Sequence, residues 1–295
     1  MNLKHKLKRL YYEARNWEPI WNFLNRHARE KWQKENPTLD DEQKRIAREL
    51  TENGIAFSNM EKLGLLDLFL DMKNFTEEKL KDPEIINEIE SKKNFPKGKK
   101  GEKTFFIYLF GGDKGMGKLD ERNPFMKFSL SRKIRDTAGE YLKLKPSFNS
   151  FYLMSTIVVQ RDSDAYLSQR WHRDPEDKKL VKVFVYLNDV DEGTGPFTYI
   201  MGSQYGGKWR GIFPQRPPAG SYPPDGEVEK LVPQNDVKIC TAPAGTVIFC
   251  DTSGLHKGGF STEKSRLMSM SCFVSAASTY LKNYESTKDN ITSYI

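Results

Sequence analysis

Residues 169–174 read Gln-Arg-Trp-His-Arg-Asp and place His172 two positions before Asp174. On an extended strand, side chains two positions apart point to the same face of the sheet. An imidazole nitrogen and a carboxylate oxygen from this segment can therefore reach one metal ion. Much further along the chain, segment 251–256 ends in a second histidine, His256.

The four histidines of the chain fall into two pairs by their surroundings. His5 and His27 lie in charged, helical segments that are typical of a solvent-exposed surface. His172 and His256 both lie beside predicted strand ends. A lone buried histidine is more often a hydrogen-bonded core residue than a ligand, but two histidines and a nearby Asp174 match the facial triad of non-haem iron enzymes. We therefore predict that His172, Asp174 and His256 bind a metal ion.

The rest of the sequence favours iron over zinc. A zinc hydrolase usually carries the helical motif HExxH, which the chain lacks. Arg266 lies ten residues after His256, at the head of an apolar run. A guanidinium binds a carboxylate through two hydrogen bonds and stays charged when buried, so Arg266 is expected to hold the far carboxylate of a cosubstrate. A structural salt bridge is the alternative for Arg266. Asp251 either orients His256 or caps its turn.

Composition describes a globular protein. Of the 295 residues, 37% are hydrophobic and 12% are aromatic. The three cysteines form no CxxC pair, so neither a disulfide scaffold nor a zinc-thiolate site is predicted. The charged N-terminal segment lacks the apolar stretch of a signal peptide, and no apolar run is long enough to cross a bilayer. We expect a cytoplasmic protein without a membrane span.

The net charge of +7 is compatible with an anionic partner such as nucleic acid, a phosphorylated substrate or a membrane surface. A solvated basic surface is the favoured interpretation, because the basic residues lack the aromatic interleaving of a nucleic-acid-binding face. Nucleic acid is therefore the less favoured partner. A small-molecule substrate is expected, and the basic excess is compatible with an anionic or nucleotide-linked one.

Helical spacing of apolar residues predicts one or two amphipathic helices between residues 2 and 35. Their apolar stripe is expected to pack on the body of the domain, with docking on a partner or membrane as the alternative. A further helix is predicted from Thr38, as its N-terminal cap, to about Glu52, where Asn53 and Gly54 end it. The stripe comprises Leu3, Leu7, Leu10, Tyr11, Ala14, Trp17, Ile20, Trp21 and Leu24.

The second half of the chain has the pattern of short strands separated by Gly, Pro, Asn and Asp. Such a series predicts an antiparallel sandwich or barrel, and the helices gather at the front of the chain. The predicted class is therefore α+β with a double-sheet β core. The strand candidates are residues 55–57, 151–160, 180–187, 195–200, 245–250 and 267–274.

Several segments resemble the phytanoyl-CoA dioxygenase (PhyH)-like family of Fe(II)/2-oxoglutarate-dependent oxygenases. The likeness extends over residues 45–277. It implies a double-stranded β-helix (jelly-roll or cupin-like) core with N-terminal and flanking helices. The segments that carry it are residues 52–57, 172–174, 181–187, 189–191, 195–203 and 243–249, together with His256 and Arg266.

The resemblance implies a role for each site residue. His172, Asp174 and His256 would bind Fe(II), the centre that uses O₂, and Arg266 would hold the C5 carboxylate of 2-oxoglutarate. Phe184 matches a position that lines the cosubstrate pocket.

By strand alternation, Lys182 and Tyr186 share the face of Phe184, and Lys182 is expected to add a second positive contact. The family often ends its Gly-Ser motif with a histidine, but Gln204 stands there in this chain, and Met201 stands where proline is frequent. Neither residue is expected to touch the metal.

Three segments are expected: an N-terminal helical extension (1–44), an oxygenase domain (45–277) and a C-terminal tail (278–295). Residues 205–233 are rich in Pro and Gly and carry Lys208, Arg210 and Arg216. This insertion is expected to be a lid or substrate-facing loop, with a solvated surface loop as an equal alternative.

The expected function is hydroxylation of a C–H bond with release of succinate and CO₂. Related halogenases replace the acidic ligand with a small residue, whereas this chain keeps Asp174. Two alternatives stay open: a non-catalytic metal-binding protein of the same fold, and a nucleic-acid binder that uses the basic N-terminal half.

Overall fold

The computed structural model describes residues 3–93, 105–112, 118–120, 122–159, 165, 167–217, 220–278, 280 and 285–286. Its helices are α1 (Leu3–Asn16), α2 (Glu18–Leu24), α3 (Arg26–Glu35), α4 (Asp41–Asn53), α5 (Leu66–Leu80), α6 (Pro83–Lys93), α7 (Pro124–Leu130), α8 (Arg132–Leu142) and α9 (Glu227–Leu231). Its strands are β1 (Ile55–Asn59), β2 (Phe106–Gly111), β3 (Lys118–Leu119), β4 (Ser147–Thr156), β5 (Val181–Tyr186), β6 (Thr198–Ile200), β7 (Val237–Ile239), β8 (Thr246–Cys250), β9 (His256–Lys257), β10 (Leu267–Val274) and β11 (Glu285–Ser286).

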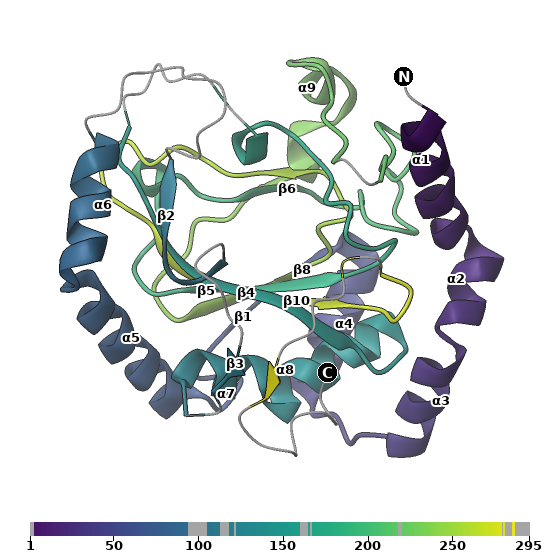
Figure 1. The fold of residues 1–295 in the computed structure, drawn as a ribbon, viewed down its shortest axis with the longest axis horizontal. Helices are drawn as coiled ribbons and strands as arrows, with labels where there is room; N and C mark the ends of the chain where they lie inside the picture. Colours follow the sequence, from purple (N-terminus) through teal and green to yellow (C-terminus); the bar gives the residue numbers. More distant parts are fainter. Residues whose placement is uncertain are drawn as a thin grey trace.

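Two antiparallel sheets form the core. The main sheet has the strand order β1-β8-β5-β10-β4-β2 and crosses the centre of Figure 1. The smaller sheet has the order β7-β6-β9, and the segment around His172 pairs with β9 through an isolated bridge to His256. Buried residues of both sheets share one apolar cluster, among them Phe184 of β5 and Tyr199 of β6. The prediction of an α+β protein with a double-sheet core is confirmed.

Strand β5 shows how each face of the main sheet is used. Val181, Val183 and Val185 belong to the apolar cluster on the helix-covered face. Phe184 and Tyr186 belong to the cluster between the sheets. This alternation confirms that Phe184 and Tyr186 share the interior face, as the period of two predicts.

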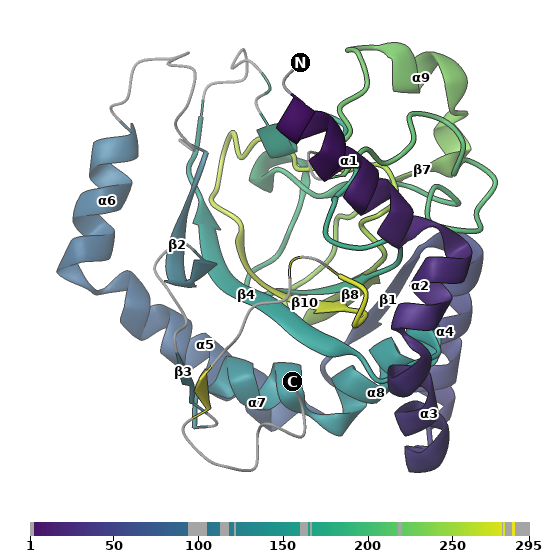
Figure 2. The same ribbon diagram turned by 45° about the vertical axis from the view of Figure 1, so that its right-hand side comes forward.

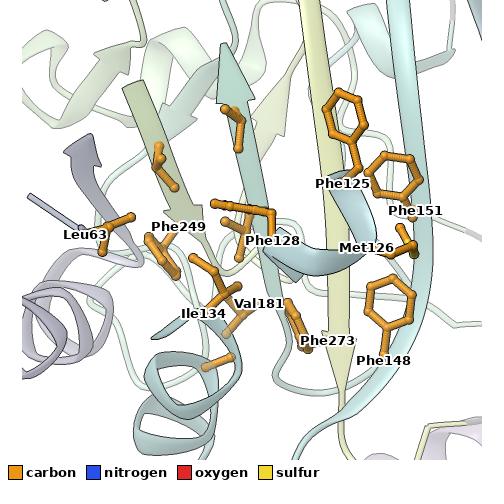
Figure 3. Close-up of a cluster of buried hydrophobic side chains, with 14 of the residues drawn as sticks. Leu63, Phe125, Met126, Phe128, Ile134, Phe148, Phe151, Val181, Phe249 and Phe273 are labelled. Carbon is orange, nitrogen blue, oxygen red and sulfur yellow. The ribbon is translucent and has the colours of Figure 1, made fainter. Parts of the chain in front are cut away.

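Helices α7 and α8 cover the outer face of the main sheet. Asn123 caps α7 by accepting from the backbone N–H of Phe125, and Ser131 caps α8 by accepting from that of Ile134. Figure 3 shows the side chains of these helices pointing at the strands, and the rings of Phe125 and Phe151 lie 5.5 Å apart. This apolar layer fixes the sheet from outside, so its inner face is left for the site.

The N-terminal part forms three helices rather than the predicted one or two. The helical conformation is interrupted at Trp17, two residues before Pro19, and again at Asn25. The helices nevertheless attach to the body: Trp21 Nε1 donates to Asp177 at 2.9 Å, and Asn25 Nδ2 donates to Ser275 Oγ at 3.1 Å. In Figure 2 they lie on one side of the molecule, and α5 and α6 lie on the other.

The predicted core face of the first helix is wrong for α1. Most of its apolar stripe faces solvent, because α1 contacts the body through few residues such as Arg15, whose Nε donates to the carbonyl of Ala277 at 2.9 Å. Trp21 of the stripe is buried as predicted. The exposed members are Leu7 (58% exposed), Leu10 (60%), Tyr11 (54%) and Trp17 (63%).

Helix α4 has a capping interaction at each end. Asp40, rather than the predicted Thr38, is the cap: its carboxylate accepts from the N–H of Gln43, whose side chain accepts from the N–H of Asp40. At the other end, Gly54 takes a left-handed conformation (φ +77°) and donates to the Leu50 carbonyl at 2.9 Å. The predicted stop at Asn53 and Gly54 is confirmed.

The proposed division at residues 44 and 277 stays a prediction, and most of the tail 278–295 lies outside the described residues. Within the described ranges, no helix has the length and apolar character that a membrane span requires.

Gly54 offers a test of the tight packing behind the site. A Cβ at Gly54 would lie 2.3 Å from the Tyr199 hydroxyl, whereas one at Gly64, also at positive φ, would meet nothing within 4 Å. We expect Gly64→Ala to lower the free energy of unfolding by about 1 kcal/mol. Gly54→Ala should lower it by about 3 kcal/mol, because overpacking adds about 1–3 kcal/mol. Urea unfolding measures both, and equal losses would contradict the close contact.

Candidate metal centre

The structure brings His172, Asp174 and His256 together at one point between the sheets. One ligand atom from each lies within 4.8 Å of the other two. His172 Nε2 lies 3.7 Å from Asp174 Oδ1, and His256 Nε2 lies 3.4 Å from Asp174 Oδ2. The backbones of the two histidines exchange N–H···O bonds of 2.9 and 3.0 Å. Two segments far apart in sequence are therefore held in a register that gathers the three side chains.

Both imidazole rings are oriented by backbone carbonyls. His172 Nδ1 lies 2.8 Å from the carbonyl oxygen of Arg170, and His256 Nδ1 lies 3.0 Å from that of Gly254. A carbonyl accepts only, so each Nδ1 carries the proton and each Nε2 presents its lone pair. A metal-binding histidine usually donates the N–H of its other ring nitrogen to such an acceptor, and this bond fixes the orientation of the ring.

Burial sets the charges of the cluster. Burial and the neighbouring His256 lower the pKa of His172 to about 3, so its imidazole is neutral near pH 7. Burial alone would raise the pKa of Asp174, but Lys182 and His256 outweigh it and hold that pKa well below its usual range. The cluster thus offers two imidazoles and one carboxylate, a donor set that suits a divalent transition metal.

Arg266 is buried in the same interior. Its backbone N–H donates to Thr156 Oγ1 at 2.6 Å, and its Nη1 donates to the Gly195 carbonyl. Phe197, two residues after Gly195, has its ring 5.5 Å from that of His256. Gly195 and Phe197 thus connect Arg266 to the cluster along a short stretch of chain.

The guanidinium of Arg266 keeps an unused donor. Its Nε is buried, and no group in the described ranges accepts from it. No carboxylate forms an ion pair with Arg266 there either, so the salt-bridge alternative is not found among the described residues. Burial lowers the pKa of Arg266, while Tyr186 and Tyr152 oppose that shift. A buried cation with a free donor is suited to an anionic ligand.

No protein-family model and no curated protein matches the sequence. Solved structures do match. The epimerase SnoN in complex with Fe3+, α-ketoglutarate and nogalamycin RO aligns over 82% of this chain and 86% of its own, with 13% identity and a TM-score of 0.55. EctD from S. alaskensis with 2-oxoglutarate and 5-hydroxyectoine aligns over 80% and 76%, with 15% identity and a TM-score of 0.51.

The fold is that of the iron- and 2-oxoglutarate-dependent oxygenases. EctD with bound Fe aligns with this chain as well, over 86% and 85% of the two chains, at 14% identity and a TM-score of 0.50. Since identity is so low, the likeness is one of fold. It confirms the double-stranded β-helix core that the sequence predicted.

Phe184 and Lys182 differ in what they contact. The Phe184 ring lies 5.2 Å from that of Phe197, on the interior face that holds the triad. Lys182 Nζ lies 2.6 Å from Asp174 Oδ2 and 3.2 Å from Glu176 Oε1. Lys182 therefore neutralises two buried acids, and its contact with a cosubstrate stays a prediction.

Asp251 caps its turn rather than orienting His256. One carboxylate oxygen accepts from the N–H of Ser253 at 2.9 Å, and the other accepts from the Tyr141 hydroxyl at 2.7 Å. His256 uses the Gly254 carbonyl instead. Asp251 thus shapes the turn that carries the ligand.

Gln204 serves helix α4. Its side-chain amide donates to the carbonyls of Thr51 and Glu52 at 3.0 and 3.3 Å, and so satisfies two groups at the C-terminal end of that helix. It makes no described contact with the triad.

Arg173 is the supporting residue that the sequence analysis missed. It lies between two ligands and points to the other side of their strand, where its guanidinium donates only to backbone carbonyls. Strand alternation predicts that Arg173 points away from the ligands, but the sequence does not indicate which carbonyls accept from it. They belong to Ser203 (2.5 Å), Ser253 (2.8 Å), Phe213 (2.9 Å), Ile212 (3.0 Å), Trp209 (3.2 Å) and Arg210 (3.4 Å).

The pairing of Lys182 with Asp174 and Glu176 predicts a charge-dependent stability. Lys182→Met would leave two buried carboxylates without their cation, so in EDTA we expect the free energy of unfolding to fall by about 3–5 kcal/mol. Adding Glu176→Gln should restore part of that loss, because one of the two like charges is gone. Urea unfolding of the single and double variants measures the coupling. A loss under about 0.5 kcal/mol, as for a surface substitution, would contradict the assignment.

Proposed function

We propose that the protein is an Fe(II)- and 2-oxoglutarate-dependent dioxygenase that hydroxylates a C–H bond of a small molecule and releases succinate and CO₂. The observation that carries this proposal is the buried triad, in which two Nε2 atoms and one carboxylate meet at one point. Two histidines and one carboxylate are the facial donor set of non-haem iron oxygenases. The solved structures of SnoN and EctD, which share the fold, were determined with iron and with 2-oxoglutarate.

The residues present fit both ligands. His172, Asp174 and His256 would hold the iron, because their donors are two imidazoles and a carboxylate whose pKa is held well below its usual range. Arg266 would hold the distal carboxylate of 2-oxoglutarate, since its buried Nε has no described acceptor. A planar guanidinium with a spare donor suits a carboxylate better than an ammonium would.

Each part of the chain then has a defined task. Bound iron, together with 2-oxoglutarate and O₂, supplies the oxidising chemistry. The carbonyls of Arg170 and Gly254 fix the direction of both imidazoles, and Lys182 keeps Asp174 charged. The rings of Phe184 and Phe197 make the surroundings of the triad apolar, which would keep water from the reacting centre.

Asp174 supports hydroxylation over a reaction that needs an added halide ligand. Its carboxylate lies between the two imidazoles and occupies the place that a small residue would leave open. The substrate itself is proposed only by class, a small molecule with an accessible C–H bond. A mass-spectrometric screen for the gain of one oxygen atom that depends on 2-oxoglutarate would identify it.

His172→Ala tests the triad. We expect this variant to lose metal-dependent turnover of 2-oxoglutarate by at least about 100-fold, because an open facial site needs all three donors. Succinate formed by purified protein with Fe(II), 2-oxoglutarate and ascorbate is the measurement. The matched control is His27→Ala, which removes an exposed histidine whose described ion-pair partner is Glu30, and it should leave turnover unchanged.

Two outcomes would decide against parts of the proposal. Full turnover in His172→Ala would show that the triad is wrongly assigned. Tight binding of Fe(II) or Mn(II) by the unaltered protein without any succinate would instead identify a non-catalytic metal-binding protein.

Arg266→Gln tests the cosubstrate site separately. Losing a charge-assisted hydrogen bond to a carboxylate should raise the KM for 2-oxoglutarate by about 10–100-fold. Metal binding should persist, because Arg266 makes no described contact with the triad. Arg122→Gln, at an exposed arginine, is the control. An unchanged KM would show that another group binds the distal carboxylate.

A further inference from the structure

A cavity lies between the N-terminal helices and the insertion. It has a volume of about 270 Å³. Asn16 and Trp17 line it from the end of α1, and Tyr205, Arg210 and Gln215 line it from the insertion. Arg173, Lys178 and Ser253 belong to its wall as well.

This cavity lies behind the metal strand. Successive side chains of an extended segment alternate, so Arg173 points away from His172 and Asp174. Gln215 forms another part of the wall, and its amide donates to the backbone carbonyls of Asp174 and Asp177. The cavity therefore shares one strand with the triad and lies on its opposite side, outside the proposed iron and 2-oxoglutarate site.

Lys178 gives the cavity a cation. The residue is only 5% exposed. Its ammonium lies 4.3 Å from the ring centroid of Tyr205 and 5.6 Å from that of Trp21, both cation–π contacts. Within the described ranges no carboxylate or carbonyl accepts a hydrogen bond from it. Its Nζ is not one of the fully buried polar atoms without a partner, so the ammonium faces the open cavity, where an anion can accept a hydrogen bond from it.

Arg210 adds a second cation at the opening. Its guanidinium lies 3.8 Å above the Tyr205 ring, and its side chain forms no ion pair with a described carboxylate. Glu13 also lines the cavity, but its carboxylate pairs with Arg9 at 2.6 Å, and Glu18 accepts from the Tyr205 hydroxyl at 2.9 Å.

Arg173 does not compete for an anion. All its described hydrogen bonds go to backbone carbonyls. The cationic donors that remain for a ligand are therefore those of Lys178 and Arg210, which both lie against the ring of Tyr205.

We propose that this cavity binds a small anionic ligand with a planar apolar part. A phosphate or carboxylate group would accept hydrogen bonds from Lys178 and Arg210. The planar part would pack against Trp17 and Pro214, which line the same cavity. The proposal is independent of the oxygenase reaction, because none of these residues belongs to the triad or to the Arg266 site.

Phenyl phosphate is a suitable probe, since it combines the oxyanion with one aromatic ring. Calorimetric titration of metal-free, full-length protein in EDTA at fixed ionic strength should give saturable binding. Lys178→Met should weaken that binding by at least about tenfold, and Arg210→Gln should weaken it several-fold. Lys230→Met removes an equal charge from the exposed helix α9 and should leave the affinity unchanged.

Absence of saturable binding, or equal affinity in Lys178→Met, would overturn the proposal. Phenol tests the need for charge, and binding as tight as that of phenyl phosphate would also overturn it. Arg210 is exposed, so Arg210→Gln keeps the test valid if the buried Lys178→Met variant fails to fold. In that case an unchanged affinity of Arg210→Gln would count against the site.

Discussion

The candidate site depends on one short antiparallel pairing. The backbones of His172 and His256 exchange two hydrogen bonds, and the N–H of Asp174 donates to the Thr252 carbonyl at 2.9 Å. These bonds place the two ligand segments in one register, and a slip by one residue would turn every ligand to the other face of its strand. The metal-binding geometry is therefore a property of the backbone ladder before it is a property of the side chains.

Around this ladder, two buried cations form hydrogen bonds or ion pairs with different kinds of partner. Arg173 has backbone carbonyls, and Lys182 has the carboxylates of Asp174 and Glu176. Lys178 and Arg266 are different, because each keeps a donor for which the described residues offer no acceptor. Burial without an acceptor is unfavourable for the guanidinium of Arg266, and the ammonium of Lys178 opens on a cavity, so these two positions mark where ligands are expected.

Much of the interior could be predicted from the sequence. Strand β10 has the predicted bounds, and the triad follows from four histidines and one His-x-Asp spacing. Other features depend on distant contacts. The residues next to Arg173 in the sequence do not indicate which backbone carbonyls accept from its guanidinium. The apolar stripe of α1, with Leu7 and Leu10, has the pattern of a core face, yet the outer face of the sheet is already covered by α7 and α8. Periodicity shows which side of a helix is apolar, but it does not show whether a neighbour reaches that side.

The carbonyl bonds of Arg173 also have a mechanical consequence. One guanidinium ties Ser203 and the segment from Trp209 to Phe213 to the strand that carries two of the candidate ligands. That part of the insertion should move with the strand as one rigid body, because several bonds would have to break together before it could swing away. Gln215 and Ser221 are bonded to the same segment, so if the insertion opens and closes during turnover, the hinge must lie after Ser221.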